Sequence, residues 1–589
     1  MRLAAATTLL LLTVIGVSGA GEATAASSTV SISPLKGTPT ALPRTQISFL
    51  GASAKALRDV SVVGSVSGRH SGHLKSYAAA TGASFKPSKA FTPGEHVNVH
   101  AKLKTSKGNL RSLSTSFTIA QPAVISQNEF PPVVGTPADL QSFPSRPDLR
   151  PAKLTVNQST AGVSPGYLFT SPALGPGQYG PMIFDNAGKL QWFRPLAGGE
   201  DATDFRTQTY RGKKVLTWWQ GRTLQFGFGL GKNVVVDNRY KTVATIKAGN
   251  GLQADEHEFS LEPNGSALVL AYSPVRASLA SAGGPASGIV LEGIIQQIDV
   301  KTGLVMWEWH SLGHVDVSES YSKLPGDPAN PYDYFHINSV TTDKHGNFLI
   351  SARNTWAIYQ INGRSGAVTW RLAGKKSSFT LGAGVQFAYQ HNAEWLPNGN
   401  ISLFDDEGAP PIKPPSRGEI VKLDLKAKTA TLAQQFVRSP NPLITNSQGN
   451  AQSEPNGNWM IGWGGLPNIT EFNNQGQVVF DAQFPKGENS YRIYRETWSG
   501  QPTTSPVVVA KTVGATTTVN VSWNGATQVA SWELLSGSSA ASLSSVSKTP
   551  KSGFDTAISA PATTLVEVRA LDGAGKTLGT SKPVTPTSG

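Results

Sequence analysis

The chain of 589 residues contains no cysteine. Without thiols it has no disulfides, no thiolate metal sites and no cysteine nucleophile, and a lipid anchor on an N-terminal cysteine is also excluded. Stability must therefore come from buried apolar surface and strand pairing, and any catalysis must use other side chains.

Long apolar runs are scarce as well, and the one clear run lies at the N-terminus. It extends from Leu3 to about Val17 and is followed by the small-residue cleavage site Ala23-Thr24-Ala25. This is the pattern of a secretory signal peptide, which we place at residues 1–25. We therefore expect a secreted, extracellular protein without a membrane span, and we leave a periplasmic location and an association with the cell wall open.

Charged residues are few, 15 % of the chain, yet the net charge is +13. The lysines and arginines are dispersed and do not form the basic stripe that is typical of nucleic-acid binding. We expect no nucleic-acid partner, and the sequence does not indicate an oligomeric state.

Helical periodicity is nearly absent beyond the N-terminus, whereas the chain has 60 Gly and 39 Pro. Such a composition is typical of many short strands and turns, so the fold class that we predict is all-β. The length is too great for one ordinary core. Composition divides the chain into an N-terminal β-sandwich-like domain (26–122), a Pro-rich strap or linker (123–160), a repeated region (161–500) and a fibronectin-type or Ig-like β-sandwich (501–589).

The region 161–500 repeats two hairpins in alternation. One contains an Asn-Gly or similar turn, as in Leu261-Glu-Pro-Asn-Gly-Ser-Ala-Leu-Val-Leu, and the other ends near an aromatic residue. The glycines of the first hairpin stand at 212, 265, 346, 399 and 457, with spacings of 53, 81, 53 and 58 residues. Two hairpins in each unit of this length predict four-stranded blades, and an opening unit at about 160–196 makes the count a six-bladed β-propeller.

Three histidines recur at one place in this repeat. His257, His336 and His391 precede the turn glycines by 8, 10 and 8 residues. The first strand of each blade lines the central channel, so equivalent positions on these strands should converge at one end of it. Asn338 shares a strand face with His336, and Arg353 ends the next strand. A neutral histidine whose other nitrogen is held is a good nucleophile or base near neutral pH.

Other interpretations of these histidines remain open at this stage. They are structural if they only cap strand ends. Three imidazoles around an axis also suit Zn²⁺ with an open position, which would make the protein a metal-dependent hydrolase or lyase. A third alternative is a non-catalytic propeller that binds cell wall or glycan. His310 and His314 stand at the edge of an insertion, where a structural role is favoured.

In combination, several motifs resemble the bacterial arylsulfate sulfotransferases, in particular their actinobacterial and fungal branch. These motifs are G-P-M-I-F-D-N-A-G-K-L-Q-W, D-E-H-E-F, Y-F-H-I-N-S-V, S-A-R-N and Y-Q-H-N-A-E-W-L, within about residues 140–500. The resemblance implies a six-bladed propeller with an N-terminal β-domain. It also implies transfer of a sulfuryl group from a phenolic sulfate to a phenol, in a ping-pong cycle through a sulfohistidine, without a nucleotide donor or other cofactor.

The resemblance also implies roles for individual residues. His391 matches the histidine that becomes sulfated, His257 and His336 match the other pocket histidines, Asn338 matches a substrate-binding asparagine, and Arg353 matches the arginine that clamps the sulfate. Among the aromatic residues expected near the channel mouth, Tyr334 and Tyr389 are candidates to stack on the aryl ring. The C-terminal domain is an addition to the family pattern.

Overall fold

The computed structural model describes residues 30–589, so the predicted signal peptide lies outside the described residues. The regular elements of the described chain are β-strands and five short 3-10 helices, which confirms the predicted all-β class. No helix in residues 30–589 has the length and apolar character needed to cross a bilayer.

The N-terminal part packs two four-stranded sheets around an apolar core that includes Phe49, Val97 and Phe117. Strand β7 alternates exposed and buried residues, with His96 and His100 on its exposed face. One sheet has the order β1-β2-β6-β5 and the other β4-β3-β7-β8, with the strands β1 (Ser31–Ser33), β2 (Ile47–Leu50), β3 (Leu57–Gly64), β4 (Gly68–Arg69), β5 (Gly72–Ser76), β6 (Gly82–Pro87), β7 (His96–Lys104) and β8 (Leu110–Thr118).

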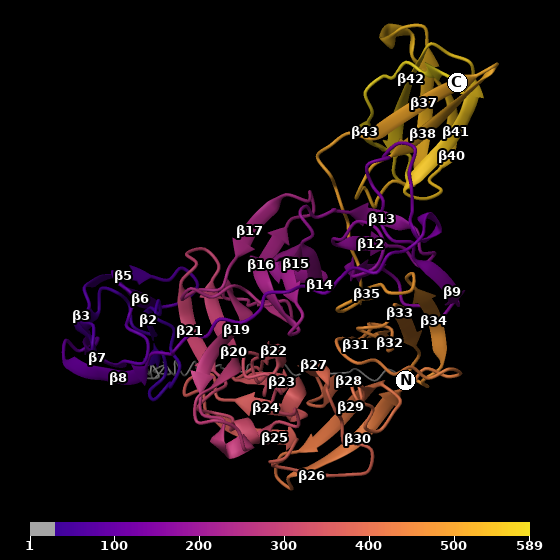
Figure 1. Cartoon of the computed structure of the whole chain (residues 1–589). Coiled ribbons are helices and arrows are strands. Elements are labelled where there is room, and N and C mark those ends of the chain that lie inside the picture. Colours follow the sequence, from indigo (N-terminus) through magenta and orange to yellow (C-terminus); the bar gives the residue numbers. More distant parts are fainter. Residues whose placement is uncertain (1–29) are drawn as a thin grey trace, which may run out of the picture.

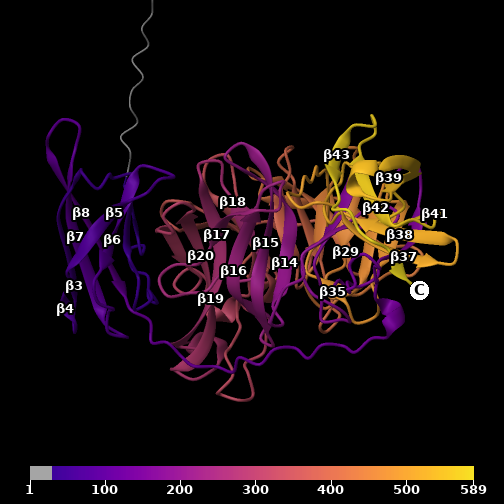
Figure 2. The same ribbon diagram turned by 90° about the horizontal axis from the view of Figure 1, so that it is seen from above.

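An extended segment leads from these sheets to the far side of the molecule (Figure 2). It is attached to the sheets it passes by isolated bridges, Pro122 to Val275 and Glu129 to Leu224. Its one turn of 3-10 helix is η1 (Pro137–Asp139). The proline-rich stretch forms no regular ladder along these sheets, because proline cannot donate to one.

Six sheets of four or five strands follow between residues 155 and 496 of the described chain, and they are arranged around a common centre (Figure 1). They are antiparallel except for the short parallel pairing of β26 with β30. Five of them take their core strands in sequence order, β14 to β17, β18 to β21, β22 to β25, β27 to β30 and β31 to β34. The bounds of the first two of these are β14 (Asp201–Tyr210), β15 (Lys213–Leu224), β16 (Phe228–Val236), β17 (Thr242–Ile246), β18 (Phe259–Leu261), β19 (Ser266–Ala277), β20 (Gly288–Asp299) and β21 (Val305–His310).

The next three sheets repeat this arrangement. Their bounds are β22 (Ile337–Thr342), β23 (Phe348–Ala352), β24 (Ala357–Ile361), β25 (Val368–Ala373), β26 (Thr380–Leu381), β27 (His391–Trp395), β28 (Ile401–Asp405), β29 (Arg417–Asp424), β30 (Thr429–Phe436), β31 (Asn450–Ser453), β32 (Trp459–Gly462), β33 (Asn468–Phe472) and β34 (Val478–Gln483). The hairpin glycines adopt the positive φ that such turns require, for example +88° at Gly265 and +82° at Gly399.

The remaining sheet joins the two ends of this region. Its order is β13-β12-β10-β36, so its innermost strand comes from the far end of the repeat and pairs Tyr167 with Glu496. Strand β9 is added to the outer edge of β34, and β11 pairs with β35. These elements are β9 (Thr155–Ser159), β10 (Tyr167–Thr170), β11 (Pro172–Ala173), β12 (Met182–Phe184), β13 (Leu190–Phe193), β35 (Asn489–Ser490) and β36 (Tyr494–Glu496). Strands from the start of the region thus pair with strands from its end. This pairing closes the circle of sheets and covers strand edges that would otherwise be open.

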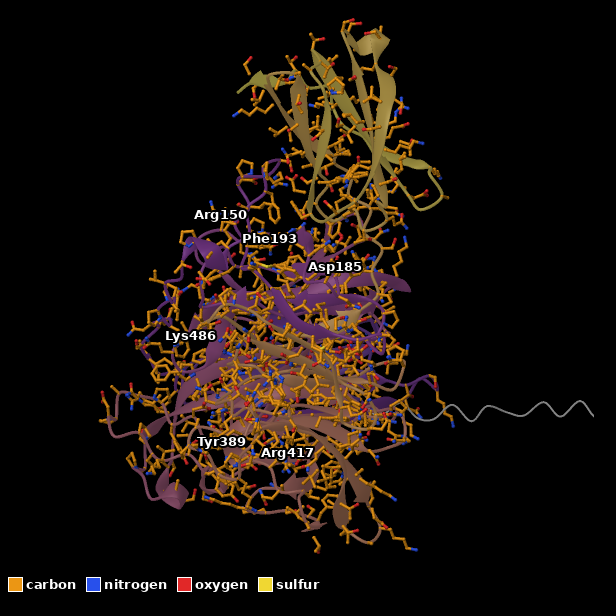
Figure 3. All side chains as sticks on the ribbon, turned by 90° about the vertical axis from the view of Figure 1, so that its right-hand side faces the viewer. Arg150, Asp185, Phe193, Tyr389, Arg417 and Lys486 are labelled. Atoms are coloured by element: carbon orange, nitrogen blue, oxygen red, sulfur yellow. The ribbon has the colours of Figure 1, made fainter. Side chains whose placement is uncertain are left out.

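The C-terminal part again packs two sheets, ordered β41-β38-β37-β44 and β40-β39-β42-β43, around a core that contains Trp532. Asn524 attaches it to the propeller-like region by accepting a hydrogen bond from the Phe193 backbone N–H (3.0 Å) and donating to the Phe193 carbonyl (2.8 Å), at the junction visible in Figure 3. The strands are β37 (Val507–Val513), β38 (Thr516–Ser522), β39 (Ser531–Gly537), β40 (Ser544–Pro550), β41 (Asp555–Pro561), β42 (Leu565–Leu571), β43 (Thr577–Thr580) and β44 (Thr587–Ser588).

Candidate active site

The structure brings the three histidines together at one end of the innermost strands. His257 lies just before β18, His336 directly before β22, and His391 is the first residue of β27. The rings of His257 and His336 are perpendicular, with centroids 5.0 Å apart. Tyr491 lies between the outer two, 5.4 Å from His257 and 6.4 Å from His391. Residues separated by more than 130 positions thus form one cluster.

Each histidine is held by a carboxylate at Nδ1. Asp255 lies 2.5 Å from Nδ1 of His257 and Asp406 lies 2.7 Å from Nδ1 of His391. Asp333 makes the same contact with His336. A carboxylate at one ring nitrogen orients the imidazole and directs its other nitrogen, Nε2, away from the partner. Each of the three imidazoles is therefore held through the same ring nitrogen.

His391 is held in one tautomer by its second contact. The backbone N–H of Gln448 donates to Nε2 of His391 over 3.2 Å, so Nε2 carries the lone pair and Nδ1–H donates to Asp406. Burial and the positive charge of Arg353 lower the pKa of His391 well below its usual value. The ring is 1 % exposed and neutral. A neutral imidazole with its lone pair at Nε2 is the nucleophilic form.

The other two histidines differ in charge. Burial opposes ionisation of His257, but the carboxylate of Asp255 outweighs it, so the pKa of His257 is raised above the usual histidine value. Burial lowers the pKa of His336, and the charges of His257 and Arg353 add to this effect, although Asp333 acts against it. The cluster therefore combines one ring whose pKa is raised with two rings whose pKa values are lowered.

Arg353 supplies a fixed positive charge beside His391. It opens the 3-10 turn η4 (Arg353–Thr355), directly after β23. Its guanidinium lies 4.8 Å from the ring centroid of Tyr389 and donates to the carbonyl of Asn446 over 2.8 Å and to the side chain of Asn354 over 2.9 Å. A guanidinium held in this way is suited to bind tetrahedral oxyanions.

The family comparison covers this cluster. The model of the arylsulfotransferase (ASST) family matches residues 206–485, which contain all three histidines and Arg353. This match supports the arylsulfotransferase family. Tyr491 and the strand β36 lie just beyond the matched segment.

Beyond this family match, the chain has only distant similarity to known proteins. No curated protein sequence matched the chain. Similar solved structures include a protein of unknown function from Bacteroides caccae (14 % identity, 56 % of this chain and 98 % of that chain, TM-score 0.34). A catalytically inactive virginiamycin B lyase from Staphylococcus aureus is also similar (9 % identity, 55 % of this chain and 86 % of that chain, TM-score 0.25). At these TM-scores the likenesses carry no weight for function.

Asn338 lies next to the histidine cluster, but its contacts are with the protein. Its side-chain amide donates to the carbonyl of Gln390 (2.8 Å), the residue before His391. The backbone carbonyl of Asn338 accepts a hydrogen bond from the guanidinium of Arg492 (3.0 Å). Its Oδ1 is buried and has no hydrogen-bond partner among residues 30–589. In this structure the side-chain amide of Asn338 positions the strand of His391, while its Oδ1 atom accepts no hydrogen bond from residues 30–589.

The two tyrosines predicted to bind the aryl ring are separated by the fold. Tyr389, visible in Figure 3, is half-buried beside Arg353. Tyr334 is fully buried in the hydrophobic core, where its ring lies 5.7 Å from that of Phe335. The structure therefore does not bring Tyr334 into the histidine cluster. His310 also lies elsewhere, between Glu292 and Glu308.

Sequence reasoning missed several members of the cluster. Asp333 stands three residues before His336 and Asp406 stands 15 residues after His391, and the sequence pattern predicted neither pairing. Gln448 and Tyr491 come from segments outside the repeated hairpins, and no motif pointed to them. Tyr272, whose hydroxyl donates to the Ile337 carbonyl over 2.6 Å, lies 5.8 Å from both His257 and His336.

A buried ionic network lies next to the cluster. The guanidinium of Arg492 donates to Asp204 and to Glu258, each over 3.0 Å, and Arg206 also pairs with Glu258. Asp204 and Arg206 lie on β14, Glu258 directly precedes β18, and Arg492 lies two residues before β36. Within residues 30–589, no group of three or more His, Cys, Asp or Glu side chains is arranged to hold a metal ion.

Proposed function

We propose that this protein is an arylsulfate sulfotransferase that moves a sulfuryl group from a phenolic sulfate ester to a phenol, independently of a nucleotide donor. The observation that carries the proposal is His391: Nδ1–H is held by Asp406, Nε2 carries the lone pair and accepts the Gln448 backbone N–H, and burial with the nearby charge of Arg353 lowers the pKa of the ring well below its usual value. The arylsulfotransferase match over residues 206–485 supports the same assignment.

In the first half of the proposed cycle, Nε2 of His391 attacks the sulfur of the donor. The S–N bond forms as the bond between sulfur and the aryl oxygen breaks, and the electron pair of that bond leaves with the phenolate. Charge on the sulfuryl oxygens is stabilised by the Arg353 guanidinium, because sulfuryl transfer, like phosphoryl transfer, depends mainly on positioning and electrostatics.

His257 is the proton donor to the leaving phenolate in this proposal. Burial opposes the charged form of His257, but its carboxylate partner Asp255 stabilises that form and raises the pKa of the ring. A phenol with a pKa near 10 is a poor leaving group as a free phenolate at neutral pH, so protonation lowers the barrier. His336, which is neutral, lies 5.0 Å away between ring centroids and is positioned to orient the sulfuryl oxygens.

The second half reverses these steps with an acceptor phenol. Its hydroxyl proton passes to His257 as its oxygen attacks the sulfur, the S–N bond breaks, and the electron pair returns to Nε2 of His391. One site therefore serves donor and acceptor in turn, which is a ping-pong cycle through a sulfohistidine. Tyr389 is placed to contact the aryl ring, because its own ring is fixed next to Arg353.

Several finer features belong to the same proposal. We infer that the six sheets act as the blades of a six-bladed propeller, that the flanking sheet pairs are accessory β-sandwich domains, the C-terminal one Ig-like, and that the protein acts outside the cell. The phenolic substrates are small molecules, and no resident cofactor takes part in the steps above.

The decisive experiment follows transfer from 4-nitrophenyl sulfate to phenol and then examines the protein by mass spectrometry after donor alone. We expect an added SO₃ on the peptide that contains His391, and the added group should disappear when phenol is supplied. His391→Ala should remove both transfer and the adduct, whereas His345→Ala, in an exposed turn, should change neither. Release of nitrophenol at the same rate without phenol, and without an adduct, would identify a sulfatase instead.

A further inference from the structure

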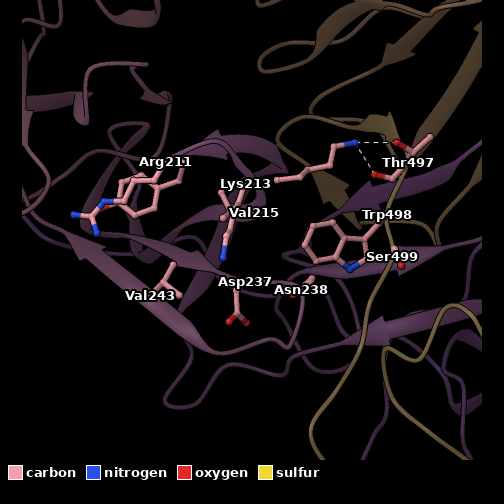
Figure 4. A pocket seen from close by; sticks show the side chains of 11 residues that line it. Arg211, Lys213, Val215, Asp237, Asn238, Val243, Thr497, Trp498 and Ser499 are labelled. Atoms are coloured by element: carbon pink, nitrogen blue, oxygen red, sulfur yellow. Dashed lines mark hydrogen bonds between the residues drawn. The ribbon is translucent and has the colours of Figure 1, made fainter. Parts of the chain in front are cut away.

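A groove of about 880 Å³ lies on the outside of the sheet formed by β14 to β17, away from the histidines. It is lined by the turn between β14 and β15, by the turn between β16 and β17, and by residues 497–499, which lead toward the C-terminal sheets. Figure 4 shows Arg211 and Trp498 at opposite sides of this groove. Its volume is within the range of ligand sites in proteins.

The groove is held open by hydrogen bonds between its walls. The Lys214 ammonium donates to the carbonyl of Thr497 over 2.7 Å and to its hydroxyl over 2.9 Å (Figure 4). The Trp498 indole donates to the hydroxyl of Tyr240 over 3.1 Å, and that hydroxyl donates to the carbonyl of Gly525 over 2.8 Å. These contacts join the sheet of β14 to β17 to residues 497–498 and to Gly525 of the C-terminal part. The groove therefore exists before any ligand binds.

Positive charge dominates its lining. Arg211 and Lys213 are exposed on one turn, and Lys214 is a third cation, although its ammonium lies 3.8 Å from the Glu496 carboxylate. The only carboxylate in the lining is Asp237, whose Oδ1 already accepts the backbone N–H groups of Arg239 and Lys241, each over 2.9 Å. Two protruding cations without a carboxylate partner in the lining attract anionic groups from solution.

The floor of the groove is apolar. Val215 is buried, Val243 is 46 % exposed, and the Tyr210 ring lies 5.0 Å below the guanidinium of Arg211. Trp498 is only 8 % exposed, so it cannot offer a free face for stacking a nucleobase. A ligand that fits must therefore combine repeated anionic groups with rings that pack edge-on against a shallow apolar surface.

We propose that this groove binds a polyanionic carbohydrate chain, with sulfate or carboxylate groups at Arg211 and Lys213 and sugar rings against Tyr210 and Val243. The groove is open and its cations stand on the rim, where a single ion pair contributes little. A polymer offers many anionic groups to the same rim, whereas a small aryl anion would need an enclosed apolar pocket. The site is separate from the histidine cluster and does not depend on the sulfotransferase proposal.

The test measures binding of a heparin-derived oligosaccharide to the full-length protein by calorimetry at physiological salt. The double variant Arg211→Ala, Lys213→Ala should weaken binding about tenfold, because most of the contact energy at the groove comes from these two cations. The matched control is Lys344→Ala, Lys426→Ala, which removes the same charge from exposed turns of other sheets. The control should stay within about threefold of the parent protein if the groove is the site.

Equal loss in both double variants would mean that the probe senses only the net charge of +13, and the groove proposal would be wrong. Polygalacturonate and neutral dextran complete the design: the carboxylated polymer should compete with heparin and dextran should not. A short DNA duplex that binds as tightly as heparin, with the same sensitivity to Arg211 and Lys213, would overturn the choice of carbohydrate. Thermal unfolding of each variant establishes that the fold is kept.

Discussion

The backbone N–H of Gln448 donates to Nε2 of His391 over 3.2 Å, so the atom that would attack sulfur is covered by the chain itself. The same loop also contacts Arg353, whose guanidinium donates to the carbonyl of Asn446 over 2.8 Å. Gln448 holds a left-handed φ of +70°, which is unusual for a residue other than glycine. One short loop therefore contacts both groups that the proposed chemistry needs, and a sulfate ester has to replace it.

This relationship predicts that Gln448→Gly opens the site more easily. Glycine adopts φ of +70° without strain, and its greater freedom lowers the cost of moving the loop. The rate of histidine sulfation in a single turnover should rise or stay equal, while the apparent KM for 4-nitrophenyl sulfate falls by about two- to fivefold. A large loss of rate would show that the observed loop position is the reactive one.

The pH dependence should identify the neutral histidine. The reactive form of His391 is unprotonated, and its pKa lies well below the usual value of about 6.5. The sulfation rate should therefore persist as pH falls through 6.5 and decline only at more acidic pH. On the alkaline side it should fall as His257 loses its proton, above its usual pKa, because that pKa is raised. Stopped-flow release of nitrophenol from pH 4.5 to 9 measures both limbs, and a half-loss near 6.5 would contradict the assignment.

Asp406→Asn tests how His391 is positioned. The amide keeps the size of the carboxyl group, but it offers an N–H donor as well as an acceptor to Nδ1, so the ring is free to take the wrong tautomer. We expect the sulfation rate to fall by about 10²- to 10⁴-fold with little change in KM. Asp424→Asn, on an exposed turn, is the matched control and should be silent. A proportional rise in KM would point to a defect in binding rather than in the nucleophile.

The two tyrosines provide a contrast within one experiment. Tyr389→Ala removes the ring that lies 4.8 Å from Arg353 and should raise KM for aryl sulfates by about three- to tenfold. Tyr334→Phe removes a buried hydroxyl that has no hydrogen-bond partner within residues 30–589 and should leave both kinetic constants unchanged. The reverse pattern would place the aryl ring on the other side of the cluster.

His310 should give the fold a measurable pH dependence. Its ring lies between Glu292 (3.2 Å) and Glu308 (3.1 Å), with Thr40, Asn250 and Gln296 as the other polar neighbours of these carboxylates. Although burial opposes its charge, the two carboxylates raise the pKa of His310 to about 10. The unfolded value is about 6.5, so this stabilisation is complete below 6.5 and is lost as pH rises toward 10.

The comparison of Tm at pH 6 and pH 9.5 measures this effect. His310→Gln should lower Tm at pH 6, where the charged ring contributes about 1 to 3 kcal/mol, and the difference from the parent should shrink at pH 9.5. His314→Gln, in the neighbouring insertion, is the control for loss of a histidine. A difference between parent and His310→Gln that does not change with pH would show that the ring acts through packing alone.

The sequence was informative where one hairpin repeats. Turn glycines such as Gly265 and Gly399 require positive φ, so their spacing marked each hairpin and aligned His257, His336 and His391 on equivalent strands. The convergence of these rings follows from that alignment. The chemical roles of the three imidazole rings do not follow from the alignment, because these roles depend on the charge and burial around each ring.

The remaining parts of the cluster depend on contacts between distant segments. Tyr334 was placed near the site by its proximity to His336, but His336 has φ of +54°, which breaks the strand alternation and turns its neighbours in other directions. Gln448 belongs to a loop and Tyr491 to the segment before β36, and neither has a counterpart in the repeat. Positions that do not recur leave no periodic signal to read.

The closing strand β36 also sets the order in which the protein can become active during its synthesis. Tyr491, Arg492 and Tyr494, which contact the histidine cluster or its ionic network, come about 100 residues after His391 and are the last of these residues to be made. A nascent chain that has all three histidines but lacks this strand has an open ring and no closed site. If the protein is exported as an extended chain, it therefore crosses the membrane without a competent reaction centre and acquires one only where it completes folding.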